Sequence, residues 1–273
     1  MRPHGAGFVG SASGIHFVQS VYNAMSKPEP PTNLVPGEDD QLTNGGFETV
    51  LWRQHELASS DGQLLLQDIL DWSQSYFDNW HPAFPLLHAP TIIEYFSKLC
   101  LGPLSTAVSR ITNTQLAIVR SVLSISLADS RQSGLPIQLP PALVFHSYEE
   151  AIQSVQPVLI NRPSIESLQA AMSVQLFLIS MLRLNAASRI QGIIIRLILQ
   201  MGLHRCPRRF SSFTQHEAAI RQRTFWSAFT VDRYLSQCLG LPLTLRDDDI
   251  DVCHLDHELH TSELDEDISM HFF

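Results

Sequence analysis

The side chains best suited to metal chemistry gather near the C-terminus, where Cys253, His254, His257 and His260 fall within residues 253–260. Thiolate and imidazole are preferred zinc ligands, but a structural zinc site needs four of them that converge on one point. On a helix the three His would step around the axis and share a face only loosely. The cluster is therefore either a weak metal site or a His-rich acidic tail, and we favour the tail and assign no metal.

Other candidate groups are sparser. His81 and His88 flank an apolar, proline-rich turn, where they are either an acid–base pair or hydrogen-bonded structural imidazoles, and we favour the structural role. The acidic run 247–251 could hold a hard cation, but it lacks the Gly and the terminal Glu of an EF-hand loop, so a solvated turn is favoured. The sequence has no G-x-S-x-G elbow, Gly-rich phosphate loop or H-E-x-x-H motif. We therefore predict no catalytic residues and no enzyme.

Composition describes a globular chain of 273 residues, 44% hydrophobic and 16% charged. The four cysteines, at 100, 206, 238 and 253, form no C-x2-C pair, so the sequence builds neither a zinc finger nor a zinc cluster. No apolar run approaches the ~20 residues that a membrane span needs. We expect a soluble protein of a reducing compartment, the cytosol or the nucleus.

Charge is distributed unevenly along the chain, whose formal net charge is −9. Residues 151–246 carry eleven Arg, no Lys and three acids, whereas residues 247–273 carry ten acids and no base. The Arg-rich stretch is either a nucleic-acid footprint or one side of an intramolecular neutralisation. We favour neutralisation, because the acidic run follows the basic stretch directly.

Hydrophobic periodicity predicts helices throughout, and no strand. Leu65, Ile69, Trp72 and Tyr76 form a helical stripe that the prolines at 82 and 85 end. Capping-box spacing predicts helix starts at Thr91, Ser147 and Thr214, and a further stripe runs over 116–127. Stripes over 166–182 and 187–201 predict an antiparallel pair. The glycines at 202 and 240 should end the helices before them. The fold class is therefore all-α, an irregular multi-helix domain.

Four blocks of sequence, in a fixed order, resemble one family. The first is Gly10 to Phe17, and the second runs from Tyr76 to Thr91 through Trp80-His81-Pro82-Ala83-Phe84-Pro85 and His88-Ala89-Pro90. The third is Arg196 to Arg205, ending in Gly202-Leu203-His204-Arg205, and the fourth combines Arg221 to Phe229, including Phe225-Trp226, with Asp232-Arg233, Gly240-Leu241-Pro242 and 249–252. Together they are similar to the fungal-specific transcription factor domain, the middle homology region of fungal zinc-cluster regulators such as xylanolytic activators.

The resemblance implies a regulatory region that modulates transcription by RNA polymerase II and does not itself read DNA. It also implies a nuclear protein whose zinc lies only in a DNA-binding module upstream of this chain, with other transcription factors or transcriptional regulators as partners and no membrane. We divide the chain into an opening segment of the regulatory region (1–25), a mobile linker rich in Pro and acids (26–60), the helical domain (61–255) and an acidic tail (256–273). No ligand-binding residue or cofactor is assigned within the chain.

Two further hypotheses remain. One keeps the resemblance and makes the chain a free-standing adaptor or inhibitor that pairs with related transcription factors through its apolar helices. The other is a metal-dependent helical enzyme built on the 253–260 cluster.

Overall fold

The computed structural model describes residues 21, 51–58, 63–133, 137–210 and 212–253. Within these ranges the chain forms eight α-helices and no β-strand, with only isolated bridges at Leu57–Leu139 and Gln63–Pro103. The helices are α3 (Leu66–Ser75), α4 (Ala89–Leu99), α5 (Leu104–Ala107), α6 (Asn113–Ser133), α7 (Tyr148–Ser154), α8 (Ile165–Ser180), α9 (Leu184–Gln200) and α10 (Gln215–Leu239). The all-α prediction is confirmed. The predicted opening segment, apart from Val21, lies outside the described residues, as do the linker up to residue 50 and the acidic tail.

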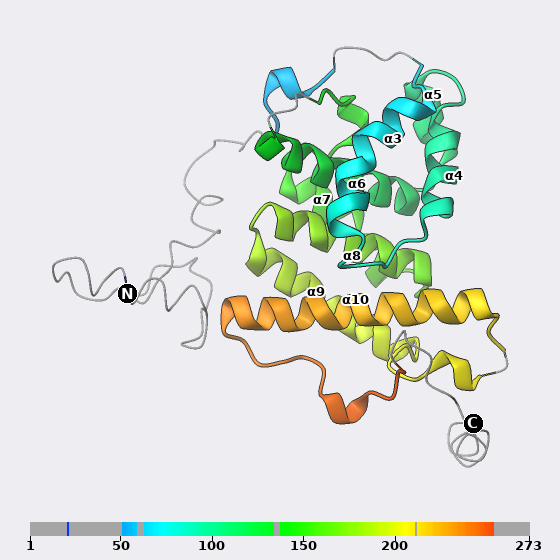
Figure 1. Cartoon of the computed structure of the whole chain (residues 1–273), viewed down its shortest axis with the longest axis vertical. Helices are drawn as coiled ribbons and strands as arrows, with labels where there is room; N and C mark the ends of the chain where they lie inside the picture. Colours follow the sequence, from blue (N-terminus) through cyan, green and yellow to red (C-terminus); the bar gives the residue numbers. More distant parts are fainter. Residues whose placement is uncertain (1–20, 22–50, 59–62, 134–136, 211, 254–273) are drawn as a thin grey trace.

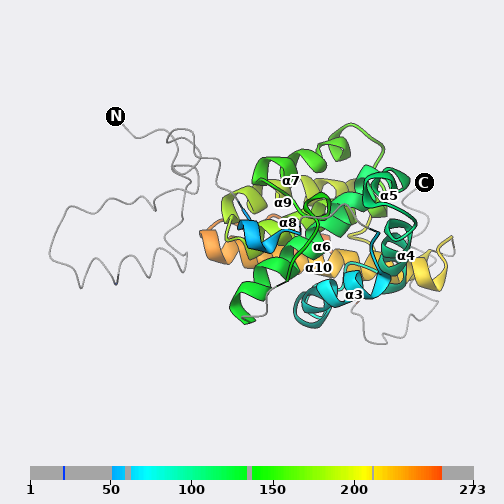
Figure 2. The same cartoon turned by 90° about the horizontal axis from the view of Figure 1, so that it is seen from above.

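The helices stack in layers around α6. Helix α8 packs along α6, α9 packs on α8, and α10 closes the stack (Figure 1). Seen from above, α3 and α7 lie on opposite sides of α6 (Figure 2). None of the helices in the described ranges is long and apolar enough to span a membrane.

Helix α6 is buried around nearly its whole circumference, and its core serines satisfy neighbouring backbone groups. The Ser126 hydroxyl accepts a hydrogen bond from the backbone N–H of Tyr76 at 3.1 Å, and that of Ser124 accepts one from Phe145 at 3.2 Å. Because buried backbone donors need partners, these serines allow irregular segments to pack directly against the central helix.

Residues 51–58 lie within the predicted linker, yet they pack on the helical body. Trp52 is buried and donates its indole N–H to the Phe145 carbonyl at 2.6 Å. Arg131 holds Glu56 with two hydrogen bonds of 2.6 and 2.8 Å, and this contact is the main reason why the pKa of Glu56 lies below its usual value. A linker in this region therefore has to end before Leu51.

Two of the predicted capping boxes cap helices and one does not. At Thr214 the hydroxyl accepts from the Glu217 amide, and the Glu217 carboxylate accepts from the Thr214 amide. Ser147 likewise caps α7 through the Glu150 amide. The predicted start at Thr91 is wrong, because α4 begins at Ala89 with His88 as its N-cap.

The error at Thr91 has a local cause. Pro90 fits the first turn of a helix, where its missing N–H costs nothing, so the helix can start before Thr91. The Thr91 hydroxyl then bonds the His88 ring nitrogen Nδ1 at 2.9 Å. Helix α3 starts one residue later than its stripe suggested, and Leu65, expected to be buried, is 64% exposed.

Both predicted glycine stops are confirmed. Gly202 and Gly240 have φ of 67° and 66°, in the left-handed region that other residues enter only with strain. In each case the next amide bonds back to the helix: Leu203 to the Ile198 carbonyl and Leu241 to the Ser236 carbonyl, both at 2.9 Å. These bonds satisfy carbonyls that a helix end leaves open.

A buried chain of side-chain amides joins α8, α9 and α10. Gln175 of α8 donates to the Gln191 side-chain oxygen at 2.7 Å and to the Ala187 carbonyl at 3.0 Å. Gln191 of α9 in turn donates to the Ala228 carbonyl of α10 at 3.0 Å. Only three residues separate α8 from α9, and Gln175 bonds to two residues of α9 beyond this turn, which fits the predicted antiparallel pair.

Replacing Gln191 with Leu will lower the free energy of unfolding by about 1–3 kcal/mol, because the buried Gln175 amide loses one of its two acceptors and the Ala228 carbonyl loses the Gln191 donor. Urea denaturation of the purified chain measures this. Gln200→Leu, at an exposed position of the same helix, is the matched control and should leave the midpoint nearly unchanged. Equal midpoints for the two variants would contradict the role of Gln191.

Candidate functional site

The sequence blocks singled out above meet helix α10 at two places. Residues 80–91, here called the signature turn, connect α3 to α4, include the first three residues of α4 and approach the start of α10. Residues 241–253, here called the strap, leave the end of α10 and run back along it (Figure 1). Helix α10 thus connects the two parts of the site.

The signature turn is anchored to the central layers. The Trp80 indole donates to the Asp129 carboxylate of α6 at 3.0 Å. Gln169 of α8 donates to the Leu86 carbonyl at 2.6 Å, and Leu86 and Leu87 are both buried. Phe84 packs partly buried against the core, Pro85 is half-buried, and Pro82 and Pro90 are exposed. The turn therefore has a fixed position relative to α6 and α8.

Imidazoles and an arginine meet where the turn approaches α10. The rings of His88 and His216 lie 4.6 Å apart, edge to face. Burial lowers the pKa of His88, and the charges of His216 and Arg223 lower it further. The pKa of His81 is also lowered, first by burial and then by the charge of Arg223. Positive charge is thus disfavoured at both histidines of the turn.

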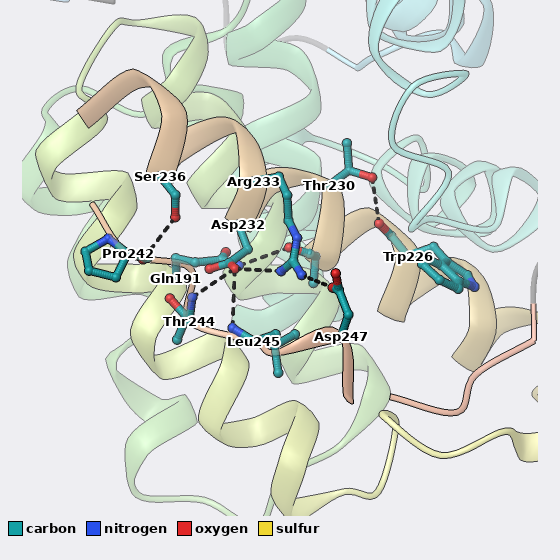
Figure 3. A network of polar contacts seen from close by, with 11 residues as sticks. Gln191, Trp226, Thr230, Asp232, Arg233, Ser236, Pro242, Thr244, Leu245 and Asp247 are labelled. Atoms are coloured by element: carbon teal, nitrogen blue, oxygen red, sulfur yellow. Dashed lines mark hydrogen bonds and ion pairs between the residues drawn. The ribbon is translucent and has the colours of Figure 1, made fainter. Parts of the chain in front are cut away.

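The strap is held by the buried carboxylate of Asp232, which is 1% exposed (Figure 3). This carboxylate accepts hydrogen bonds from the backbone N–H groups of Thr244 and Leu245 at 3.1 and 3.4 Å. It also forms an ion pair with Arg233 at 3.0 Å. Arg233 also pairs with Asp247. Asp232 therefore satisfies the hydrogen-bond donors of two strap amides, neutralises the charge of Arg233 and fixes the first half of the strap.

The second half of the strap docks on residues 202–209, the loop after α9. Asp251 accepts from the Cys206 amide at 2.9 Å and pairs with Arg209 at 2.9 Å and Arg205 at 3.7 Å. The Asp251 amide donates to the His204 carbonyl at 3.2 Å. Leu203 of this loop is buried, and burial lowers the pKa of His204. The Gly-Leu-His-Arg block and the residues that follow it, up to Arg209, thus form the surface on which the second half of the strap docks.

The strap's last described residue, Cys253, enters the core beside α10. Its carbonyl accepts from the Trp226 indole at 3.1 Å and from the Gln222 side chain at 3.3 Å. Its sulfur lies 2.9 Å from that of Cys206. Phe225 is fully buried, whereas Trp226 is only partly buried and reaches toward the strap.

Of the weak metal candidates, Cys253 points at Cys206 and Gln222, while His254, His257 and His260 lie outside the described residues. Among the residues that the structure does describe, no three His, Cys, Asp or Glu side chains gather as metal ligands. The assignment of no metal in this chain stays a prediction.

Sequence reasoning missed Cys206 and Gln222 as members of the site. The sequence could have indicated Gln222, because it shares a helix face with Ala218 and Phe225, both buried, and an amide on such a face needs hydrogen-bond partners. No sequence pattern indicates Cys206, because the residue that it contacts, Cys253, is 47 positions away along the chain.

A comparison with known protein families matches the part of the chain that holds the second, third and fourth blocks, whereas the first block, Gly10 to Phe17, lies outside the match. Residues 73–269 match the model of the fungal specific transcription factor domain, which is more than half of the chain. The chain belongs to this family.

Curated relatives are transcription regulators. The chain is 34% identical to the probable transcription factor FUP6 of Fusarium proliferatum over 280 residues, covering 93% of this chain and 39% of that protein. It is 27% identical to the transcriptional activator protein acu-15 of Neurospora crassa (64% and 18% covered) and to protein STB5 of Saccharomyces cerevisiae (89% and 36%). The chain thus spans less than two fifths of each of these relatives. No solved structure matches it.

Replacing Asp232 with Ala will lower the free energy of unfolding by about 3–5 kcal/mol, because Arg233 and two strap amides lose a buried acceptor. It will also speed tryptic cleavage after Arg246 in the strap. Asp248→Ala, which removes an exposed ion pair with Arg246, is the control and should cost about 0.5 kcal/mol or less. Equal denaturation midpoints and cleavage rates would contradict this role of Asp232.

Acid will weaken the contact between the signature turn and α10. Unfolded histidine has a pKa of about 6.5, and folding lowers that of His81 and His88. Below about pH 6.5 the histidines bind more protons in the unfolded chain than in the folded chain. The free energy of unfolding therefore falls as the pH is lowered from about 6.5 toward the pKa values of the folded chain, and it is retained above about pH 6.5. Urea midpoints at pH 7.5 and 5.5 measure the loss.

His88→Asn keeps a residue suited to the N-cap of α4 and removes the titrating ring. It should reduce the loss of stability between the two pH values, whereas His146→Asn, at an exposed position, should not. A loss of the same size in wild type and His88→Asn would exclude His88 as a contributor.

Proposed function

We propose that this chain is the regulatory part of a fungal transcription factor: it modulates transcription by RNA polymerase II in the nucleus and does not read DNA. DNA reading would belong to a zinc module outside this sequence, and the partners would be other transcription factor chains or transcriptional regulators. Membership of the family and the transcriptional names of its relatives support this proposal. The same relatives favour a protein that is not an enzyme.

The proposal that this chain does not read DNA rests on the ion pairs that the Arg-rich stretch makes within the chain. Asp251 engages Arg205 and Arg209, and Asp247 engages Arg233. Arg221 donates to the Met201 carbonyl at 2.7 Å and also lies over the Phe213 ring. A phosphate backbone would have to compete with these internal acceptors for the guanidinium groups.

The regulatory role also fits the design of the strap. It is fixed by polar contacts to α10 and to the loop after α9, and it adds only two side chains, Leu245 and Val252, to the buried apolar core, so a change in its attachment would expose little of that core. A change at the strap would reach the signature turn through α10, which contacts both.

The purified chain should show no salt-dependent binding to duplex DNA, whereas a variant carrying Asp247→Asn and Asp251→Asn should gain weak binding that falls with salt, because Arg205, Arg209 and Arg233 lose acidic partners. Titration of a labelled duplex at 50 and 200 mM salt measures this. Wild-type binding that weakens steeply between these concentrations would overturn the proposal.

A reporter in fungal cells tests the regulatory part. The chain fused to an unrelated zinc DNA-binding module and activation segment should change reporter output relative to the module and segment alone, and Asp232→Ala should abolish that change. Output that the chain leaves unaltered would count against a regulatory domain in cis. Co-purification of the unfused chain with a related full-length factor would favour the free-standing adaptor instead.

A further inference from the structure

Two cysteine sulfurs meet at the junction between the strap and the loop after α9. Cys206 is 0% exposed and Cys253 5% exposed, and their Sγ atoms lie 2.9 Å apart. A disulfide has an S–S length of about 2.05 Å, so the sulfurs need to approach by only about 0.9 Å to bond. The two residues stand 47 positions apart in the sequence, so the fold brings them together.

The surroundings of each cysteine hold it in place independently of the sulfur contact. The Cys206 amide donates to the Asp251 carboxylate at 2.9 Å, and the Asp251 amide donates to the His204 carbonyl at 3.2 Å. The Cys253 carbonyl accepts from Trp226 at 3.1 Å. Backbone positions fixed by these bonds keep the sulfurs within reach of each other whether or not they are bonded.

One contact also favours reaction at Cys253. The Gln222 amide nitrogen donates to the Cys253 sulfur at 2.8 Å, and the oxygen of the same amide accepts from Arg208 at 3.3 Å. A donor of this kind, oriented by a guanidinium group, stabilises negative charge on sulfur. The thiolate is the form of cysteine that attacks oxidants.

We propose that Cys206 and Cys253 form a redox-sensitive pair, which a peroxide converts into a disulfide that locks the strap onto the loop after α9. The Cys253 thiol releases its proton, its thiolate attacks one peroxide oxygen, the O–O bond breaks, and the leaving hydroxide takes up that proton, so a sulfenic acid and one water form. The Cys206 thiol then releases its proton, its thiolate attacks the Cys253 sulfur, the S–O bond breaks, and the leaving hydroxide takes up this proton and departs as a second water. Two thiols and one hydrogen peroxide thus give one disulfide and two waters, and a thiol reductant reverses the bond.

The bond would close a loop that contains the whole of α10. In the reduced chain the end of the strap is held by hydrogen bonds and an ion pair, which can open and close without breaking covalent bonds. In the oxidised chain that end stays attached to Cys206, the residue that follows the Gly-Leu-His-Arg block. Oxidation therefore keeps the strap in its closed, attached position.

The test uses the full 273-residue chain, reduced with a thiol reductant, freed of it, and treated with hydrogen peroxide. Trypsin cleaves after Arg, so the expected product is a cross-linked pair of peptides, 206–208 and 247–273, with two hydrogen atoms fewer than the reduced pair. The melting temperature should rise by about 5–10 °C on oxidation and return on reduction.

Matched variants separate this pair from the other thiols. Cys206→Ser should lose both the cross-link and the rise in melting temperature, whereas Cys100→Ser combined with Cys238→Ser should keep both. The wild-type comparison of reduced and oxidised chain decides the question even if the Cys206 variant fails to fold.

Three results would overturn the proposal. One is oxidation of Cys253 to sulfinic acid without the cross-link between Cys206 and Cys253, and another is a cross-link that involves Cys100 or Cys238. The third is stoichiometric zinc that survives dialysis and protects Cys206 and Cys253 from peroxide, which would make the pair part of a metal site.

Discussion

The buried amide chain from Gln175 through Gln191 to the Ala228 carbonyl fixes how α8, α9 and α10 lie against one another. Apolar side chains alone would tolerate a shift of one helix past its neighbour, because hydrophobic burial is not directional. A shift would leave buried amide groups without partners, at a cost of several hydrogen bonds. The register of α10 therefore follows from two glutamines, and the position of every group that α10 carries follows from that register.

From this fixed register α10 presents different chemistry along its length. Its first turns bring His216 and Arg223 toward the signature turn. The same half of the helix also places Gln222 and Trp226 where Cys253 ends the described strap. Its last turns hold the buried Asp232, and Gly240, at φ 66°, then lets the chain reverse. A single helix thus sets the geometry of two contacts that lie far apart in the sequence.

Sequence reasoning succeeded where the cause of a structure is local. The capping box at Thr214 and the stops at Gly202 and Gly240 depend on residues within a few positions of each other, so their spacing was enough. It failed at Thr91, where two signals overlapped and Pro90 with His88 started the helix earlier. It also misplaced Leu65, because a stripe gives the period of a helix but not its first residue.

The candidate site was harder to predict than the fold, because its contacts join distant segments. Charge counting did indicate that acids after residue 246 would meet the Arg-rich stretch, and Asp247 and Asp251 do so. No local pattern could show that the Asp232 carboxylate faces the Thr244 and Leu245 amides, since this requires the strap to turn back along α10.

The balance of forces differs between the body of the domain and the strap, and that difference bears on function. The body is held by apolar side chains that are almost fully buried, including Phe96, Phe177 and Phe225. Along the strap most side chains from Pro242 to Asp249 are exposed, and its attachment rests on Asp232, Asp251, a few backbone groups and the buried side chains of Leu245, Val252 and Cys253. Local opening follows such differences, since segments with few buried apolar contacts separate first. The strap is therefore the described element that can change state while the helical body stays folded.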